Sequence, residues 1–257
     1  MKTIAVTLLV LFAGGSGSAG AQASPAPGAK PTIVLVHGAF ADGSSWERVI
    51  PILQRDGYAV IAVQNPLASL AGDVETTKRV IDAQQGPVVV VGHSYGGAVI
   101  TEAAAGNPKV KALVYVAAFA PDEGETLNGL IERFSPSPLG RAVVPDSAGF
   151  LYVDRARFQD VFANDLARDE AALLAATQKP LAAPIFGEAV KAAAWKTIPS
   201  WYVVSTQDNA INPDLERFMA KRMGAQMREL RASHVSFISN PAEIAKVVEM
   251  ASGTVCS

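Results

Sequence analysis

The chain has 257 residues, of which 49% are apolar and 18% are charged, and this balance suits one globular domain with a large core. The formal net charge is −2 and no run of lysine or arginine occurs, so nucleic acid and anionic membrane surfaces are excluded as expected partners. A single cysteine and three histidines without a His-x-x-x-His spacing argue against a disulfide within the chain, a metal site or a metal cofactor, and the motifs described below call for no other cofactor.

The first 30 residues are typical of an export signal followed by a linker. Lys2 precedes an apolar stretch, residues 4–13, that is too short to cross a bilayer. Small residues follow and offer cleavage after Ala21 or Ala23. We therefore expect a signal peptide over residues 1–23, a Pro/Ala/Gly-rich linker over 24–30 and a mature domain over 31–257, with an uncleaved anchor as the alternative. The expected location is periplasmic or secreted, without a membrane span after cleavage.

The mature domain opens with alternating strand and helix patterns. Residues 31–36 form an apolar strand, and a loop follows at residues 37–43. Ser44 and Glu47 have the spacing of a capping box, which predicts a helix through Leu53 that ends at Gly57. A second strand is predicted over residues 58–63 and a second helix over 74–84.

The most informative stretch is the valine run at residues 88–91, which leads into Gly92-His93-Ser94-Tyr95-Gly96-Gly97. Four valines without polar alternation predict a strand buried on both faces, and the alanine-rich segment after Gly97 predicts a helix. Ser94 would then lie on a sharp strand-to-helix turn, with glycines that let the strand and the helix pass closely. A glycine-rich structural turn is the alternative interpretation.

The rest of the chain repeats this alternation around one insertion. Strands are predicted over residues 112–116, 200–205 and 227–231, and helices after Asn212-Pro213 and over 242–250, the latter capped with the help of Glu243. Residues 121–195 break the rhythm and predict a mostly helical cap, with helices over 155–166 and 169–176 and no strong strand. The fold class is therefore α/β, with a mostly parallel central sheet flanked by helices.

Three side chains could form a nucleophilic site. A serine hydroxyl needs a base, and His234 is the best candidate because it follows a strand at the edge where α/β sheets place their sites. His93 adjoins Ser94 and should point away from it, and His37 is more suited to positioning backbone. Asp208 also follows a strand and lies between the serine and the histidine in the chain, so it is the expected orienting carboxylate, with Asp122 as the alternative.

The negative charge formed during acyl transfer needs hydrogen-bond donors. The backbone N–H of Tyr95, the residue after the candidate nucleophile, is one candidate. The loop after the first strand should supply the second donor, and we expect Ala39 there, with Phe40 in reserve.

These motifs closely resemble the α/β-hydrolase superfamily. His-Gly-Ala-Phe at residues 37–40, Gly-His-Ser-Tyr-Gly-Gly at 92–97, Gln-Asp-Asn at 207–209 and Ser-His-Val at 233–235 are similar to small bacterial esterases related to plant methylesterases and hydroxynitrile lyases. The resemblance covers residues 31–251 and is weakest in the insertion. It implies an eight-stranded, mostly parallel sheet and a helical cap over the serine. It also implies that Ser94 is the nucleophile, Asp208 the acid and His234 the base, with oxyanion donors at Ala39 and Tyr95.

Two departures from that group bear on the reaction. The lyases carry threonine where this chain has Gly38, and lysine where it has Val235. Without that lysine, cyanide chemistry lacks its electrostatic partner, so lyase activity is not expected.

The expected substrate is a small neutral carboxylic ester. Phe40, Phe119 and Val235 are the candidate pocket residues, and no arginine cluster suggests a polyanion. Other aromatic residues of the insertion could face the serine or could form the core of the cap: Phe134, Phe150, Phe158, Phe162, Phe186 and Trp195. The leading hypothesis is a serine carboxylesterase. A cofactor-free haloperoxidase or perhydrolase with the same triad, and a hydrolase-like binding protein without activity, are the alternatives.

Overall fold

The computed structural model describes residues 30–255. The expected signal peptide and residues 24–29 of the expected linker lie outside these residues, as does Cys256. Within residues 30–255, no helix is both long enough and apolar enough to cross a membrane.

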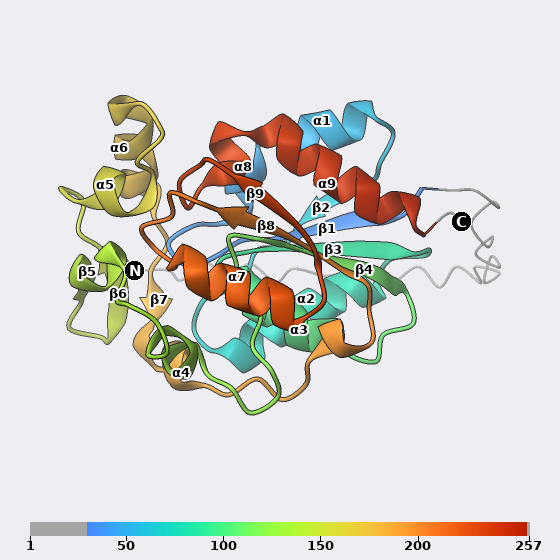
Figure 1. Ribbon diagram of the computed structural model, residues 1–257, viewed down its shortest axis with the longest axis horizontal. Coiled ribbons are helices and arrows are strands. Elements are labelled where there is room, and N and C mark those ends of the chain that lie inside the picture. The colour runs from blue at the N-terminus through green and yellow to red at the C-terminus, as the bar shows by residue number, and fades with distance from the viewer. Residues whose placement is uncertain (1–29, 256–257) are drawn as a thin grey trace, which may run out of the picture.

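The centre of the molecule is a parallel sheet (Figure 1). Six strands of the described residues form it, in the spatial order β2 (Val60–Ala62), β1 (Thr32–Val36), β3 (Val88–His93), β4 (Val110–Val116), β8 (Ser200–Ser205) and β9 (Gln226–Leu230). Every residue of β3 is buried, as the valine run predicts. The resemblance implies eight strands, whereas the sheet of residues 30–255 has six.

Helices cover both faces of the sheet (Figure 1). On one face lie α2 (Leu70–Asp82), α3 (Tyr95–Ala103) and α7 (Pro213–Arg222). On the other face α9 (Pro241–Gly253) crosses β3, β4 and β8, next to α1 (Ile50–Arg55) and α8 (Ser236–Ser239). The chain moves outward from β1 to β2 and then returns to β3 on the other side of β1. This reversal opens a crevice at the carboxyl ends of β1 and β3.

The insertion forms a cap beyond the carboxyl ends of the sheet strands, at the left of Figure 1. Helices make up most of the regular structure of the cap, as expected, but the expectation of no strong strand is wrong, because β5 (Val143–Pro145), β6 (Phe150–Val153) and β7 (Leu181–Ala182) pair as an antiparallel sheet. The Asp146 carboxylate accepts the N–H groups of Ala148 and Phe150 and thereby shapes the turn between β5 and β6. The remaining cap elements are α4 (Leu127–Ile131), η2 (Pro138–Arg141), α5 (Phe158–Phe162), α6 (Arg168–Thr177), η3 (Ala183–Gly187) and η4 (Ala194–Lys196).

The observed bounds and caps of the helices confirm one prediction and correct three. Asn212 caps α7 by accepting the Asp214 N–H, as expected. The predicted helix starting at Ser44 is instead a 3-10 turn, η1 (Gly43–Trp46), because the Asp42 carboxylate accepts the Ser44 N–H and takes the capping position. The predicted helix over residues 155–166 is shortened to α5, and α9 begins at Pro241 without the expected side-chain cap.

Candidate active site

Ser94 lies at the junction of β3 and α3, where strand and helix meet in a strained turn. Its backbone has φ 53° and ψ −124°, a conformation that non-glycine residues rarely adopt. A Cβ on Gly96 would lie 2.6 Å from the carbonyl oxygens of Val36 and His37, and one on Gly92 would lie 2.7 Å from the Gly96 oxygen. The two glycines therefore allow α3 to pass close to β1 and β3, and the serine is presented at the crevice.

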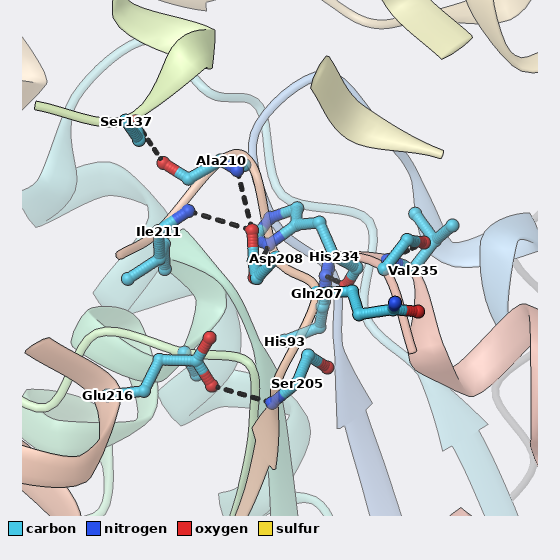
Figure 2. Close-up of polar contacts among 12 residues, drawn as sticks. His93, Ser137, Ser205, Gln207, Asp208, Ala210, Ile211, Glu216, His234 and Val235 are labelled. Carbon is cyan, nitrogen blue, oxygen red and sulfur yellow. Dashed lines mark hydrogen bonds and ion pairs between the residues drawn. The ribbon is translucent and has the colours of Figure 1, made fainter. Parts of the chain in front are cut away.

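His234 and Asp208 form a buried pair at the ends of β9 and β8. The Asp208 Oδ2 atom lies 2.6 Å from the His234 Nδ1 atom, and both side chains are buried (Figure 2). The other carboxylate oxygen, Oδ1, accepts the N–H groups of Ala210 and Ile211 at 2.6 and 2.9 Å. Both oxygens of Asp208 are thus used, and the carboxylate holds the histidine with its Nε2 atom free for other chemistry.

The alternative carboxylate, Asp122, is engaged elsewhere. It forms an ion pair with Lys196 and is partly exposed. Among the hydrogen bonds and ion pairs of residues 30–255, Asp122 forms none with His234.

The His93 side chain lies between the serine turn and the His234 loop. Its Nε2–H donates to the His234 carbonyl at 3.0 Å, and the centres of the two rings are 4.7 Å apart. Burial, followed by the charge of His234, holds the pKa of His93 well below its usual value, so the ring is neutral. The His234 Nε2 atom is buried and has no hydrogen-bond partner in the described part of the chain. A hydrogen bond to the Ser94 hydroxyl is therefore not formed in this structure, although His93 joins the two loops.

The loop after β1 packs directly on the serine. A Cβ on Gly38 would lie only 2.6 Å from the Ser94 Cβ atom. Burial lowers the pKa of His37 to about 4, so this ring is neutral; its Nδ1–H donates to the Gly38 oxygen, and its Nε2 accepts the Asn65 N–H. His37 therefore fixes the backbone of the loop that carries Ala39, as the sequence indicates, and is bonded away from the serine.

A mostly apolar cavity of about 130 Å³ adjoins Ser94, between the sheet and the cap. Ala39, Tyr95, Phe40 and Phe119 line it, as the sequence analysis expects for residues near the reaction centre. Val235 instead lines a smaller neighbouring cavity of about 50 Å³. The cap residues of the larger cavity were not predicted: Leu127, Ile131, Pro136, Ser137, Leu139, Gly140 and Val143. Phe162 and Phe186 also line it, whereas Phe134, Phe150 and Trp195 do not: Phe134 packs against Phe218 and Trp195 against Arg222, both on α7.

Two buried carboxyl groups near the site were also missed. Asp73 on α2 accepts the Tyr95 hydroxyl at 2.6 Å and the Leu67 N–H at 2.9 Å. Glu216 on α7 accepts the Ser205 N–H at 3.1 Å and lies beside Asp208 (Figure 2). Burial and the charge of Asp208 raise the pKa of Glu216 well above its usual value. The sequence signal for Glu216 is its place between Leu215 and Met219 on the apolar face of α7.

No group of three or more histidine, cysteine, aspartate and glutamate side chains within residues 30–255 is arranged to hold a metal ion. The chemistry available at the crevice is that of a hydroxyl, an imidazole–carboxylate pair and backbone N–H groups.

Comparison with known proteins gives a consistent result. The family model described as "Alpha/beta hydrolase family" matches residues 33–247. The alpha/beta hydrolase nvfD of Aspergillus novofumigatus is 29% identical over 250 residues, which cover 87% of this chain and 97% of the relative. Methylesterase 2 of Arabidopsis thaliana is 24% identical over 230 residues, covering 77% and 86% of the two chains. The crystal structure of a pyrethroid hydrolase from Sphingobium faniae superposes with a TM-score of 0.75 at 23% identity over 87% of this chain and 97% of that one, a likeness of fold.

Proposed function

The chain belongs to the alpha/beta hydrolase family, and from this premise we propose that it is a serine hydrolase that cleaves carboxylic esters through an acyl-enzyme on Ser94. The expected fold class is confirmed, and so is the expected likeness to plant methylesterases and hydroxynitrile lyases. The proposal adds to the family assignment the roles of individual residues and the class of substrate.

The observation that carries the proposal is the buried Asp208–His234 pair with its free Nε2 atom. With Asp208 at its Nδ1 atom and no hydrogen-bond partner at its Nε2 atom within residues 30–255, His234 can act as a base through Nε2. Its loop is bonded to His93, the residue before Ser94, so base and hydroxyl come from adjoining loops. In an unliganded enzyme the hydrogen bond between nucleophile and base is often long and tightens when substrate binds.

In the proposed reaction the Ser94 Oγ atom attacks the ester carbonyl carbon while His234 Nε2 takes the hydroxyl proton. Asp208 stabilises the imidazolium that forms. The backbone N–H groups of Ala39 and Tyr95 stabilise the oxyanion. Collapse of this intermediate breaks the bond to the alcohol, which receives the proton from His234. Water then attacks the acyl-enzyme by the same steps and releases the acid.

The cavity favours a neutral ester with apolar groups. Its lining is aliphatic and aromatic apart from Ser94, the Tyr95 hydroxyl bonded to Asp73, and Ser137 bonded to the Ala210 oxygen. A charged ligand would lose its hydration there without gaining a partner. Relatives named as a pyrethroid hydrolase and as methylesterases support esters of this kind.

A fluorophosphonate probe tests the nucleophile directly. Labelling is expected on Ser94 and should be absent in Ser94→Ala, which should also lose turnover of p-nitrophenyl acetate. Asp208→Asn should lower kcat by about three to four orders of magnitude because the imidazole takes the wrong tautomer. Asp122→Asn is the matched control and should retain wild-type activity. A folded wild type that neither reacts with the probe nor cleaves any ester of a broad panel would contradict the proposal.

Export through the N-terminal signal peptide is part of the proposal. It rests on the residue pattern of positions 1–23 alone. Mass spectrometry of protein recovered outside the cytoplasm of a bacterial host should find an N-terminus at Gln22 or Ser24. Recovery of the full-length chain from the cytoplasm alone would contradict it.

A further inference from the structure

The cap segment from Asp160 to Asp165 contacts both loops that carry the Asp208–His234 pair. This segment comprises the end of α5 and the residues that lead toward α6. It lies across the carboxyl ends of β8 and β9, on the cap side of the molecule (Figure 1).

Asp165 anchors the histidine loop. Its Oδ2 atom accepts two hydrogen bonds, from the Ser233 N–H at 2.8 Å and from the Ser239 hydroxyl at 2.7 Å. Ser233 directly precedes His234, and Ser239 ends α8, so one carboxylate oxygen joins both ends of the turn that presents the imidazole. Inside this turn, the Ser233 hydroxyl accepts the Val235 N–H at 3.2 Å.

The same segment holds the aspartate loop on both sides of Asp208. The Asn164 side-chain amide donates to the backbone carbonyl of Gln207 at 3.1 Å, and the Asn209 side-chain amide donates to the backbone carbonyl of Asp160 at 2.8 Å. These bonds fix the residues immediately before and after the carboxylate.

Phe162 completes the contact from within the segment. Its ring meets the His234 ring in an edge-to-face arrangement, with centres 4.8 Å apart, and it also lines the cavity at Ser94. The imidazole is therefore held between His93 on the sheet side and Phe162 on the cap side.

We propose that residues 160–165 are a positioning clamp for the Asp208–His234 pair, with Asp165 as the principal positioning residue. This inference rests on the proposed function for its kinetic consequence. Asp165 itself is exposed, so its charge is screened by water, and it acts as a hydrogen-bond acceptor for the Ser233 N–H. The cap then has two roles: it encloses the substrate cavity and it sets the geometry of the base.

The acceptor role makes the test specific. Asp165→Ala removes the acceptor, whereas Asp165→Asn removes the charge and keeps a carbonyl oxygen. Asp165→Ala should lower kcat for p-nitrophenyl acetate by about tenfold to a hundredfold, with KM changed by less than about twofold, because misplaced groups slow the chemical step. Asp165→Asn should retain most of the activity. Asp169→Ala is the matched control, since this exposed carboxylate lies outside the segment, in the first turn of α6, and accepts the N–H of its neighbour Glu170 and not a group of either loop.

A second measurement needs no substrate. The proton shared by His234 Nδ1 and the Asp208 carboxylate should give a far-downfield NMR signal in the resting wild type, because the 2.6 Å bond is short. The signal should broaden or shift in Asp165→Ala and persist in Asp169→Ala. Asn164→Ala, which frees the Gln207 side of the aspartate loop, should change it in the same direction and serves if Asp165→Ala does not fold.

The outcomes separate the two proposals. If the wild type cleaves no ester, the proposed function fails while the NMR signal still decides the clamp. An unchanged signal and unchanged kcat in Asp165→Ala would overturn the clamp, as would equal losses in Asp165→Ala and Asp169→Ala. Loss of activity in Asp165→Asn as large as in Asp165→Ala would overturn the acceptor role assigned to Asp165.

Discussion

At the scale of single residues, Gly38 packs tightly against the serine turn. An added Cβ at Gly38 would lie 2.6 Å from the Ser94 Cβ and 3.0 Å from the His93 Nδ1 atom, so either the loop or the turn would have to move. Gly38→Ala should lower kcat by about tenfold to a hundredfold, because Ala39, the expected oxyanion donor, is displaced. Gly187→Ala, where nothing lies within 4 Å of the added Cβ, is the control and should behave as wild type. Equal rates for the two variants in a p-nitrophenyl acetate assay would contradict this account.

His37 should make stability depend on pH. Its pKa is lowered to about 4 in the folded protein and is near 6.5 in the unfolded chain. Between these values the unfolded chain binds a proton that the folded protein excludes. The contribution of His37 to the free energy of unfolding is therefore fully present above pH 6.5. It falls by about 3 kcal/mol in total as the pH falls toward 4. Urea unfolding from pH 7 to 4 should show this slope, and His37→Asn should reduce it; an identical slope in the variant would exclude His37 as the cause.

Glu216 should act in the opposite direction. Burial and Asp208 raise its pKa in the folded protein, so the folded state retains a proton that the unfolded chain releases above about pH 4.5. The contribution of Glu216 to stability therefore falls as the pH rises through this window. Glu216→Gln keeps a neutral group of the same shape, so its stability relative to wild type should increase from pH 5 to pH 8 in urea unfolding. A constant difference over this range would indicate that Glu216 is already ionised in the folded protein.

The places of the candidate site residues were predictable from the sequence where a motif and a position in the strand order coincide. Ser94 follows a strand that valines alone define, and His234 follows the last strand. Glu216 and Asp165 were not recognised, because their partners Ser205 and Ser233 are brought to them only by the tertiary fold.

At the scale of elements, α2 and α3 are joined by one buried hydrogen bond. The Tyr95 hydroxyl donates to Asp73 at 2.6 Å, and burial raises the pKa of Asp73. Tyr95→Phe leaves a buried carboxyl oxygen without its donor, so the free energy of unfolding should fall by about 1–3 kcal/mol. Urea denaturation measures this loss, and Tyr152→Phe, in the cap strand β6, is the control because no hydrogen bond of its hydroxyl is recorded among the described residues. A loss as large in Tyr152→Phe would show that the effect is not due to the buried bond.

Elements with a strong pattern were predictable, and short ones were not. Strand β8 occupies the residues expected, and α7 begins at its predicted cap. The cap strands escaped detection for local reasons: β5 contains Pro145, β6 has four residues, and β7 has two. Such segments become strands by pairing with each other, which is information about distant parts of the chain.

At the scale of the whole molecule, the cavity belongs to neither the sheet layer nor the cap alone. Ala39, Ser94 and Phe119 come from loops at the sheet edge, and Leu139 and Val143 come from the cap. The length of the insertion was evident from the sequence, but its docking and the shape it encloses depend on contacts between segments far apart. Under the proposed function, the cap–sheet junction would therefore set the size of the acyl group that the enzyme accepts.

A larger side chain at this junction should change the preference for acyl-chain length and leave cleavage of the shortest ester nearly unchanged. Leu139 on η2 lines the cavity, and Leu139→Trp would occupy space that longer acyl chains need. For p-nitrophenyl esters, kcat/KM should fall with increasing acyl length, because each excluded methylene removes about 1–3 kcal/mol of binding in the transition state, while the acetate ester should be cleaved within about threefold of wild type. Leu173→Trp adds the same side chain on the outer surface of α6, where Leu173 is 63% exposed, and should leave the series unchanged. A uniform loss over all chain lengths in Leu139→Trp would mean that this cavity does not hold the acyl group.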